Sequence, residues 1–285
     1  MSETNTGMKT TQQFIKEITQ RMAEVSSEEY EADRQRRNYE ADLRKIEILN
    51  SVEGEAKYFD CRICRNRGTE AFINEYGFIS YRDCVCKKKR ECYRMMERSG
   101  IHPEVLKRFT FQNFEDNELW QKDMKHKAMQ YAKSDISEWL VLSGQSGSGK
   151  THLCTAVAKH LISQGHEVKY MLWSDIARRL TALKFKEAEY DEFFRQIVSA
   201  EVLYIDDFLK TYRDPAIAFD VINARYTARE NRATIISTEM NLDAIRNMDE
   251  ATAGRIREMS QDYCYQIKQD PNRNYRYKRK PSENG

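Results

Sequence analysis

Trp139-Leu-Val-Leu142, followed by Gly144-Gln-Ser-Gly-Ser-Gly149-Lys150-Thr151, is the stretch that decides the fold of this 285-residue chain. The first part is a short apolar run typical of a buried strand, and the second fits the pattern G-x-x-x-x-G-K-S/T. Residues 151–163 follow with a helical pattern. A glycine-rich loop between a strand and a helix turns successive backbone N–H groups, and the positive end of the helix, toward an anion. The sequence therefore predicts a phosphate-binding loop.

We predict that the ligand of this loop is a nucleoside triphosphate, ATP with Mg²⁺. The Lys150 side chain is long enough to reach the β- and γ-phosphates, and the Thr151 hydroxyl is placed to ligate magnesium. A flexible Gly/Ser loop that meets the pattern by chance is the alternative, but the flanking strand and helix argue against it. The residues expected to bind the nucleotide are Gly144, Gln145, Ser146, Gly147, Ser148, Gly149, Lys150, Thr151 and His152.

The region around the loop alternates between strands and helices. Apolar runs at 167–173, 201–205 and 233–238 predict strands, and helical patterns lie at 174–185, from there to about 199, and at 215–231. Parallel strands need long crossover connections, which helices supply, and such sheets are covered on both faces. The predicted fold is therefore α/β, a parallel sheet flanked by helices.

Two carboxylates follow the apolar residues 201–205. Asp206 and Asp207 would lie at the carboxyl edge of the sheet, where open α/β sheets bind their ligands. We assign magnesium binding to Asp206, directly or through water, and orientation or deprotonation of the attacking water to Asp207. An acidic turn after a buried strand is the plainer alternative, but the phosphate loop upstream favours ATP hydrolysis.

Two further positions are candidates for contact with the γ-phosphate. In ring-forming ATPases a polar residue after the next strand senses this phosphate, and here it is Thr238 or Glu239, with a helix cap as the alternative. Arg255 lies near a predicted helix and would reach the γ-phosphate held by a neighbouring subunit, which couples hydrolysis to assembly. The alternative for Arg255 is an ordinary exposed arginine on a helix.

A cysteine cluster precedes this region. Cys61-Arg-Ile-Cys64 and Cys84-Val-Cys86 form two close pairs, and four thiolates in a tetrahedron are a preferred ligand set of Zn²⁺. The second pair is tighter than the usual C-x2-C spacing, so Cys92 is an alternative for one ligand. We predict a structural zinc site with Cys61, Cys64, Cys84 and Cys86 as ligands, and redox-active thiols are the competing interpretation.

Composition limits the class of protein and its compartment. Apolar residues make up 40% and charged residues 32% of the chain, and the net charge of +2 does not indicate a nucleic-acid partner. Neither a long apolar run nor a signal-peptide pattern occurs, which predicts a cytoplasmic protein without a membrane span. Stable disulfides are not expected there, and the isolated Cys154 and Cys264 are interpreted as small buried apolar residues.

The first 50 residues are highly charged with a helical pattern. One helix is predicted over 11–25 and a second from about Ser27 to 49, either packed on each other or forming a short coiled coil. A partner-binding surface is compatible with this arrangement. The residues that share one face of the first helix are Phe14, Ile18, Met22 and Val25.

Basic residues gather after the cysteine cluster and near the C-terminus. Basic charge with aromatic residues in between suits a nucleic-acid strand, through phosphate attraction and base stacking, and a solvated tail is the alternative. These residues are Lys87, Lys88, Lys89 and Arg90, and then Arg273, Arg276, Lys278, Arg279 and Lys280 around Tyr275 and Tyr277.

Three motifs occur in order: 144–151 followed by His152-Leu-Cys-Thr-Ala, then Tyr204-Ile-Asp-Asp-Phe208, then Ile235-Ile-Ser-Thr-Glu239. Together they resemble the DnaC/DnaI group of replicative-helicase loaders, AAA+ ATPases that are close to the DnaA initiator and the IstB transposition helper. Arg108-Phe-Thr-Phe-Gln-Asn-Phe114 also resembles the segment that leads into their core. The resemblance covers roughly residues 100–268. The cysteine cluster is similar to the zinc domain of DnaI-type loaders, which extends the resemblance to about residue 57.

This resemblance implies an AAA+ P-loop ATPase that loads a DnaB-type hexameric replicative helicase onto DNA. The zinc domain would dock on the helicase, and the core would bind ATP and single-stranded DNA and form a homo-oligomer when ATP is bound. Arg255, in Gly-Arg-Ile, matches an arginine of the family that acts on a neighbouring subunit. Two departures stand out: Thr238-Glu239 replaces the frequent Ser-Asn, and no second sensor arginine in a separate lid domain is evident.

We expect four segments: a charged helical segment 1–56, a zinc-binding domain 57–95, an AAA+ ATPase domain 96–270 and a basic tail 271–285. An IstB-like ATPase helper of transposition is one alternative function, and the cysteine domain favours the loader over it. A zinc-dependent interaction protein with an inactive ATPase is another. The intact set of Lys150, Thr151, Asp206 and Asp207 argues against that alternative.

Overall fold

The computed structural model describes residues 11–98, 101–230 and 232–277. The chain divides into two compact units, one of Met1–Ala56 with Asp60–Cys84 and the other of Lys57–Phe59 with Val85–Gly285. This division differs from the four predicted segments. The predicted boundary after residue 95 falls inside helix α2 (Cys86–Arg98). The buried side of this helix packs into the core of the second unit, so the whole helix belongs to that unit.

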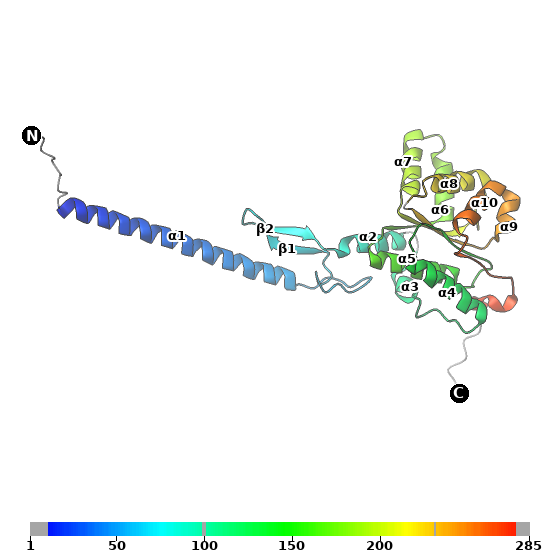
Figure 1. Cartoon of the computed structure of the whole chain (residues 1–285), viewed down its shortest axis with the longest axis horizontal. Helices are drawn as coiled ribbons and strands as arrows, with labels where there is room; N and C mark the ends of the chain where they lie inside the picture. Colours follow the sequence, from blue (N-terminus) through cyan, green and yellow to red (C-terminus); the bar gives the residue numbers. More distant parts are fainter. Residues whose placement is uncertain (1–10, 99–100, 231, 278–285) are drawn as a thin grey trace, which may run out of the picture. The chain divides into compact units, whose positions relative to one another are not determined.

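In the first unit, helix α1 (Thr11–Ser51) ends against an antiparallel hairpin, β1 (Thr69–Ile73) and β2 (Ile79–Asp83) (Figure 1). The Asn50 side chain pairs with the backbone of Ala71, donating to its oxygen at 2.9 Å and accepting from its nitrogen at 3.0 Å. The Arg67 guanidinium donates to the Asn50 side-chain oxygen at 2.8 Å. These bonds fix the hairpin to the last turn of α1.

Helix α1 is one helix of 41 residues, so the prediction of two helices with a break near Ser27 is wrong. The segment contains neither glycine nor proline, and a serine within a charged helical pattern does not by itself end a helix. Phe14, Ile18 and Met22 are 58%, 44% and 69% exposed, so the predicted packing of one half on the other does not occur. The Val25 side chain lies outside the described residues.

The second unit is built on a five-stranded parallel sheet in the order β4-β5-β6-β3-β7, which confirms the predicted α/β fold. Strand β3, which leads into the glycine-rich loop, lies between β6 and β7. Strand β7 was not predicted, since three residues are too few to show a periodic pattern. The strands are β3 (Leu140–Ser143), β4 (Val168–Leu172), β5 (Val202–Phe208), β6 (Ala233–Thr238) and β7 (Cys264–Gln266).

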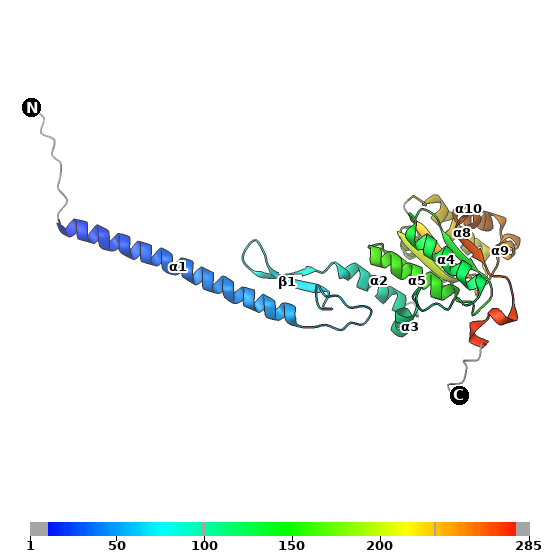
Figure 2. The same ribbon diagram turned by 60° about the horizontal axis from the view of Figure 1, so that its bottom comes forward.

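Helices cover both faces of this sheet (Figure 2). One face packs against α2, α3 (Pro103–Arg108), α4 (Leu119–Lys133) and α5 (Lys150–Gln164). The other packs against α6 (Trp173–Leu183), α7 (Glu187–Val198), α8 (Pro215–Thr227), α9 (Leu242–Met248) and α10 (Glu250–Met259). Two short 3-10 turns, Pro271–Arg273 and Tyr275–Tyr277, follow β7. Within the described ranges, no helix has the length and apolar character needed to cross a membrane.

Candidate nucleotide-binding site

The glycine-rich loop connects β3 to α5 through three glycines in left-handed backbone conformations. Gly144, Gly147 and Gly149 have φ values of 128°, 72° and 91°, a region that residues with a Cβ rarely adopt. A Cβ at Gly149 would also lie 2.6 Å from the Phe114 ring. Gly149 is the N-cap of α5, so the positive end of this helix opens into the loop. The local geometry is that of an anion-binding cradle.

Lys150, the first residue of α5, is buried within the loop. Its Nζ donates to the backbone oxygens of Gly144 and Gln145, both at 2.7 Å. Burial lowers the pKa of the Lys150 ammonium group. The structure thus places a partly desolvated cation at the centre of the predicted phosphate site.

Asp206, on β5, receives three hydroxyl hydrogen bonds. Thr151 Oγ1 donates to Oδ1 at 3.1 Å, Tyr170 OH donates to Oδ2 at 3.0 Å, and Ser237 Oγ also donates to Oδ1. Burial is the largest influence on the carboxyl group and raises the pKa of Asp206, although the hydroxyls oppose the shift. The two predicted magnesium ligands, Thr151 and Asp206, therefore meet. The contributions of Tyr170 and Ser237 were not predicted.

These groups fit a magnesium ion. Mg²⁺ prefers oxygen ligands and usually binds through one or two protein groups together with substrate phosphates, and the Thr151 hydroxyl and Asp206 carboxylate supply such oxygens beside the loop. A buried carboxylate with a raised pKa is also a group that a divalent cation would stabilise in its ionised form.

The sequence suggested that Asp207 follows the end of the strand. In the structure it lies within β5, at an irregularity of the sheet. The pairing of β5 with β6 shifts register between Ile205 and Phe208, and Asp207 has a φ of 54°. Its backbone nitrogen donates to Ser237 Oγ at 3.1 Å. A bulge of this kind separates two consecutive side chains. It leaves Asp206 buried, whereas Asp207 lines a cavity and pairs with Lys210 at 3.2 Å.

Of the two candidate sensors, Glu239 lines the cavity and Thr238 does not. Thr238 is fully buried, and its hydroxyl donates to Phe208 O at 2.7 Å and accepts from Met240 N at 3.0 Å, so it is engaged with the backbone. Glu239 pairs with Lys210 at 3.0 Å. Burial opposes ionisation of Glu239, but the hydrogen bond from Lys210 prevails and lowers its pKa. Lys210 therefore joins Asp207 and Glu239 in one charged group, which the sequence did not reveal.

Arg255 is remote from these groups within its own chain. It lies on α10, donates from Nη1 to Ala251 O at 3.0 Å, and places its guanidinium 5.0 Å from the centre of the Phe219 ring and 5.6 Å from that of Tyr226. It is not among the residues that line the cavity. Its role on a neighbouring subunit stays a prediction.

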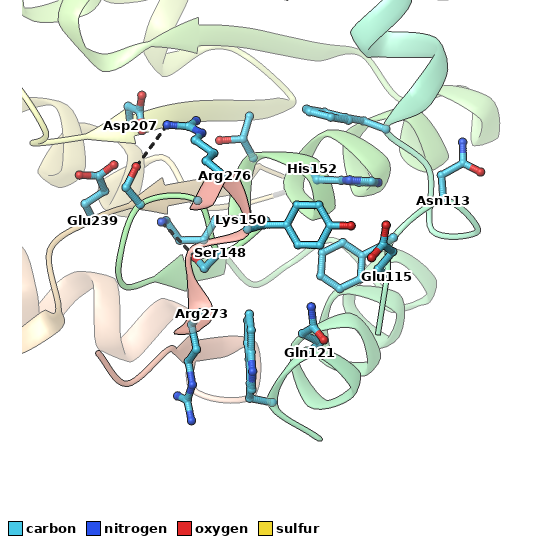
Figure 3. Close-up of a pocket in the computed structure, with 18 of the residues that line it drawn as sticks. Asn113, Glu115, Gln121, Ser148, Lys150, His152, Asp207, Glu239, Arg273 and Arg276 are labelled. Atoms are coloured by element: carbon cyan, nitrogen blue, oxygen red, sulfur yellow. Dashed lines mark hydrogen bonds between the residues drawn. The ribbon is translucent and has the colours of Figure 1, made fainter. Parts of the chain in front are cut away.

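The loop borders a cavity of about 710 Å³ that extends from Glu239 and Asp207 past Lys150 to the aromatic residues before α4 (Figure 3). At the aromatic end, the His152 ring stacks on Phe109 with centroids 4.5 Å apart and an angle of 12° between the planes. Burial lowers the pKa of His152, although its hydrogen bond to Thr110 O opposes the shift. His152 is thus an aromatic wall of the cavity. Lining residues that were not predicted as part of this site include Asn113, Glu115, Trp120, Gln121, Arg273, Tyr275 and Arg276.

The four predicted zinc ligands form one buried cluster. The sulfur atoms of Cys61, Cys64, Cys84 and Cys86 all lie within 4.8 Å of one another. Gly68 N donates to Cys64 Sγ at 3.2 Å, and Arg90 Nε donates to Cys86 Sγ at 3.3 Å. Donors of this kind stabilise thiolates that bind a metal, so the residues present fit a tetrahedral zinc ion.

The remaining cysteines lie elsewhere. Cys92 packs in the apolar core beside Tyr93, and burial raises the pKa of its thiol, so it is not the alternative ligand that the sequence allowed. Cys154 is fully buried, as expected, whereas Cys264 on β7 is only partly buried.

Three curated proteins are similar to this chain in sequence. Uncharacterized protein YqaM of Bacillus subtilis (strain 168) is 29% identical over 81% of this chain and 90% of its own length. Phage-like element PBSX protein XkdC of the same organism is 28% identical over 76% of this chain and 85% of its own. Replicative helicase loader DnaC of Buchnera aphidicola subsp. Schizaphis graminum is 24% identical over 48% of this chain and 57% of its own.

A family described as IstB-like ATP binding protein matches residues 68–278. The matched range is more than half of the chain and contains the glycine-rich loop with Lys150, both strands that carry the acidic residues, and Arg255. The resemblance inferred from the motifs is therefore confirmed at the level of the family. The chain belongs to the family of IstB-like ATP-binding proteins.

Proposed function

We propose that this protein is an ATP-dependent loader of a DnaB-type hexameric replicative helicase in bacterial or phage DNA replication. The observation that carries the proposal is the presence in one chain of a glycine-rich loop with Lys150, Thr151 and Asp206 and of a four-cysteine cluster. Its similarity to the replicative helicase loader DnaC supports the same function. ATP binding and hydrolysis would act as an assembly switch that governs when the helicase is held and when it is released on DNA.

Each residue of the ATP site has a role that follows from its position. The loop glycines present backbone N–H groups to the phosphates, and Lys150 neutralises charge on the β- and γ-phosphates. Thr151 and Asp206 would hold the magnesium ion, which neutralises phosphate charge when bound. Asp207, exposed to the cavity by the bulge, would orient the attacking water, and Glu239 would sense the γ-phosphate through Lys210.

Assembly would complete the site. Arg255 does not reach the cavity of its own chain, so a contribution to hydrolysis requires a second ATP-bound subunit beside the first. In the reducing cytoplasm, the four clustered cysteines would hold one zinc ion and so fix the loops that dock on the helicase. Single-stranded DNA bound to the assembled core would stimulate ATP turnover.

The family match supports a second candidate, an IstB-like ATPase that helps a transposase. The cysteine cluster favours the loader. An interaction protein without ATPase activity is a third candidate, and the hydrogen-bonded arrangement of Thr151 and Asp206 beside Lys150 argues against it.

The proposal is tested with the full chain, a purified DnaB-type helicase and single-stranded DNA. We expect the wild type to capture the helicase with ATP and to hydrolyse ATP faster when DNA is added. Lys150→Ala should lower turnover at least about 100-fold, because it removes a cation that stabilises charge in the transition state. Arg178→Ala, on the exposed side of α6, is the matched control and should leave turnover unchanged.

Two results would contradict the proposal. Capture of a transposase but not of the helicase would favour the IstB-like function. Binding of ATP without any hydrolysis, with or without DNA, would favour the interaction protein.

A further inference from the structure

Residues 270–277, here termed the C-terminal strap, run along the glycine-rich loop. The Gln145 side chain donates to Asp270 O at 2.8 Å and accepts from Asp270 N at 2.7 Å. Tyr275 N donates to Gly147 O at 2.8 Å, and Arg276 Nη1 donates to Ser146 Oγ at 3.4 Å. Three consecutive loop residues are therefore each bonded to the strap, which makes it a fixed neighbour of the phosphate site and not a free tail.

The approach of the strap to the loop depends on one glycine. A Cβ at Gly147 would lie 2.0 Å from Asn274 Oδ1, so a side chain at this position would require the Asn274 side chain to move. The same Asn274 oxygen accepts from Arg276 N at 3.0 Å. This bond fixes the turn from which the Arg276 side chain extends. The direction of Arg276 is thus set by this bond within the strap and by the bond of its guanidinium to Ser146 of the loop.

The strap also reaches the opposite wall of the cavity. Tyr275 faces Glu115, which belongs to the segment between α3 and α4, and interaction with this carboxylate raises the pKa of Tyr275. The Arg273 guanidinium lies 5.5 Å from the centre of the Trp120 ring. Because Glu115, Trp120, Arg273 and Tyr275 all line the cavity, the strap forms a side of the site from the loop to its mouth.

The cations around the cavity differ in what they already bind. Lys210 pairs with Asp207 and Glu239, Arg273 lies 3.7 Å from Asp270, and Lys150 is held by loop carbonyls. Arg276 also lines the cavity, yet its guanidinium forms no ion pair with a carboxylate among residues 11–98, 101–230 and 232–277. A guanidinium presents a planar set of donors that matches a phosphate oxygen pair.

Arg276 lies on the side of the loop where the terminal phosphate is expected. Its partner Ser146 and Glu239, which follows β6, both line this side of the cavity, whereas the stacked Phe109 and His152 lie at the other end. Figure 3 shows Arg276 extended beside Lys150 toward the group of Asp207 and Glu239. The position suits a phosphate oxygen and not a base.

We propose that the C-terminal strap is a wall of the ATP site in which Arg276 binds the γ-phosphate of ATP within its own chain. The inference rests on the proposed binding of ATP and is independent of the helicase as partner. Since ADP lacks the γ-phosphate, Arg276 discriminates between the two nucleotides. Arg276, on the C-terminal strap, is then a nucleotide-binding residue.

The test is equilibrium binding of fluorescent ATP and ADP analogues to the full chain. Arg276→Ala should weaken ATP binding about tenfold or more and leave ADP binding within about twofold. Arg276→Lys keeps the charge without the planar donors and should fall between wild type and Arg276→Ala. Arg178→Ala is the control with an exposed arginine removed elsewhere, and it should bind both nucleotides as the wild type does. Unchanged Tm values would confirm that each variant is folded.

Equal weakening of ATP and ADP binding, or none, would overturn the inference. Loss of single-stranded DNA binding with an unchanged preference for ATP would also overturn it and make the strap a DNA contact. A wild type that binds neither nucleotide would defeat the proposed ATP function as well. Failure to capture a helicase, with the preference for ATP lost in Arg276→Ala, would defeat only the loader function.

Discussion

Asp206 combines two opposing demands at the scale of a single residue. It is 4% exposed and held by three hydroxyl groups, which suits a magnesium ligand, but its burial disfavours the ionised form that binds a metal. Residues of this kind lower the stability of a fold for the sake of activity. Asp206 is therefore the position where activity and stability are expected to separate.

We predict that Asp206→Asn lowers ATP turnover at least about 100-fold and raises the stability of the nucleotide-free protein by ~0.5–2 kcal/mol at pH 8. The pKa of Asp206 is raised in the folded protein, so its favourable contribution is complete below the unfolded value near 3.8 and is lost as the pH rises through the folded value. The gain should therefore shrink from pH 8 toward pH 5. Thermal unfolding, monitored by circular dichroism between pH 5 and pH 8, measures this gain in stability. A Tm of Asp206→Asn below that of the wild type at pH 8 would contradict the prediction.

The meeting of Thr151 with Asp206 was predictable, because a glycine-rich loop and an acidic strand end belong to the same edge of a parallel sheet. Tyr170 and Ser237 were not predictable, since a hydroxyl within a strand has no sequence pattern that says which face it points to. Asp207 was placed at the right edge, but the bulge that turns it into the cavity depends on pairing with β6, which is a tertiary property.

At the scale of elements, the sheet and most helices were predicted from hydrophobic periodicity. The errors in the prediction arose where the local sequence carries no structural signal. The break predicted near Ser27 failed because nothing in α1 forbids helix. The strap was assigned to a tail because its contacts with the loop join residues far apart in sequence, such as Gln145 with Asp270. The role of Arg225 on α8 was also not predicted, because its contacts too join residues far apart in sequence. Arg225 is fully buried and donates to the carbonyl oxygens of Val198 and Ala200 at 2.9 Å and 2.6 Å. These two hydrogen bonds fix the turn before β5.

The cysteine cluster gives a prediction at this scale. We expect one tightly bound zinc ion per chain, and Cys61→Ser with Cys64→Ser should abolish it, because two of the four ligands are removed. Cys92→Ala is the matched control and should retain full zinc content, since Cys92 packs in the core away from the cluster. Metal analysis of the purified proteins is the measurement. An unchanged zinc content in the double variant, or its loss in Cys92→Ala, would refute the assignment.

At the scale of the whole molecule, hydrolysis is expected to depend on contact between subunits. Arg255→Ala should retain ATP binding and lose turnover by about 10³-fold or more, because an arginine supplied by a neighbour stabilises the charge of the transition state. Lys150→Ala lacks its own ATP site but retains Arg255. A mixture of the two inactive variants should therefore regain part of the activity, measured as phosphate release. Full activity of Arg255→Ala alone, or no recovery in the mixture, would speak against a shared site.

The close fit of Asn274 against Gly147 links the choice of residue in the glycine-rich loop to the choice of residue in the C-terminal strap. Any side chain at position 147 meets both an unfavourable φ and the Asn274 oxygen. Only the second obstacle disappears when position 274 becomes smaller, so the two positions are coupled, and the effect of changing one depends on the identity of the other. A C-terminal segment grafted onto this chain is therefore expected to fit only when its residue at position 274 is compatible with the residue at position 147, so the glycine-rich loop and the strap should be exchanged together in a chimera.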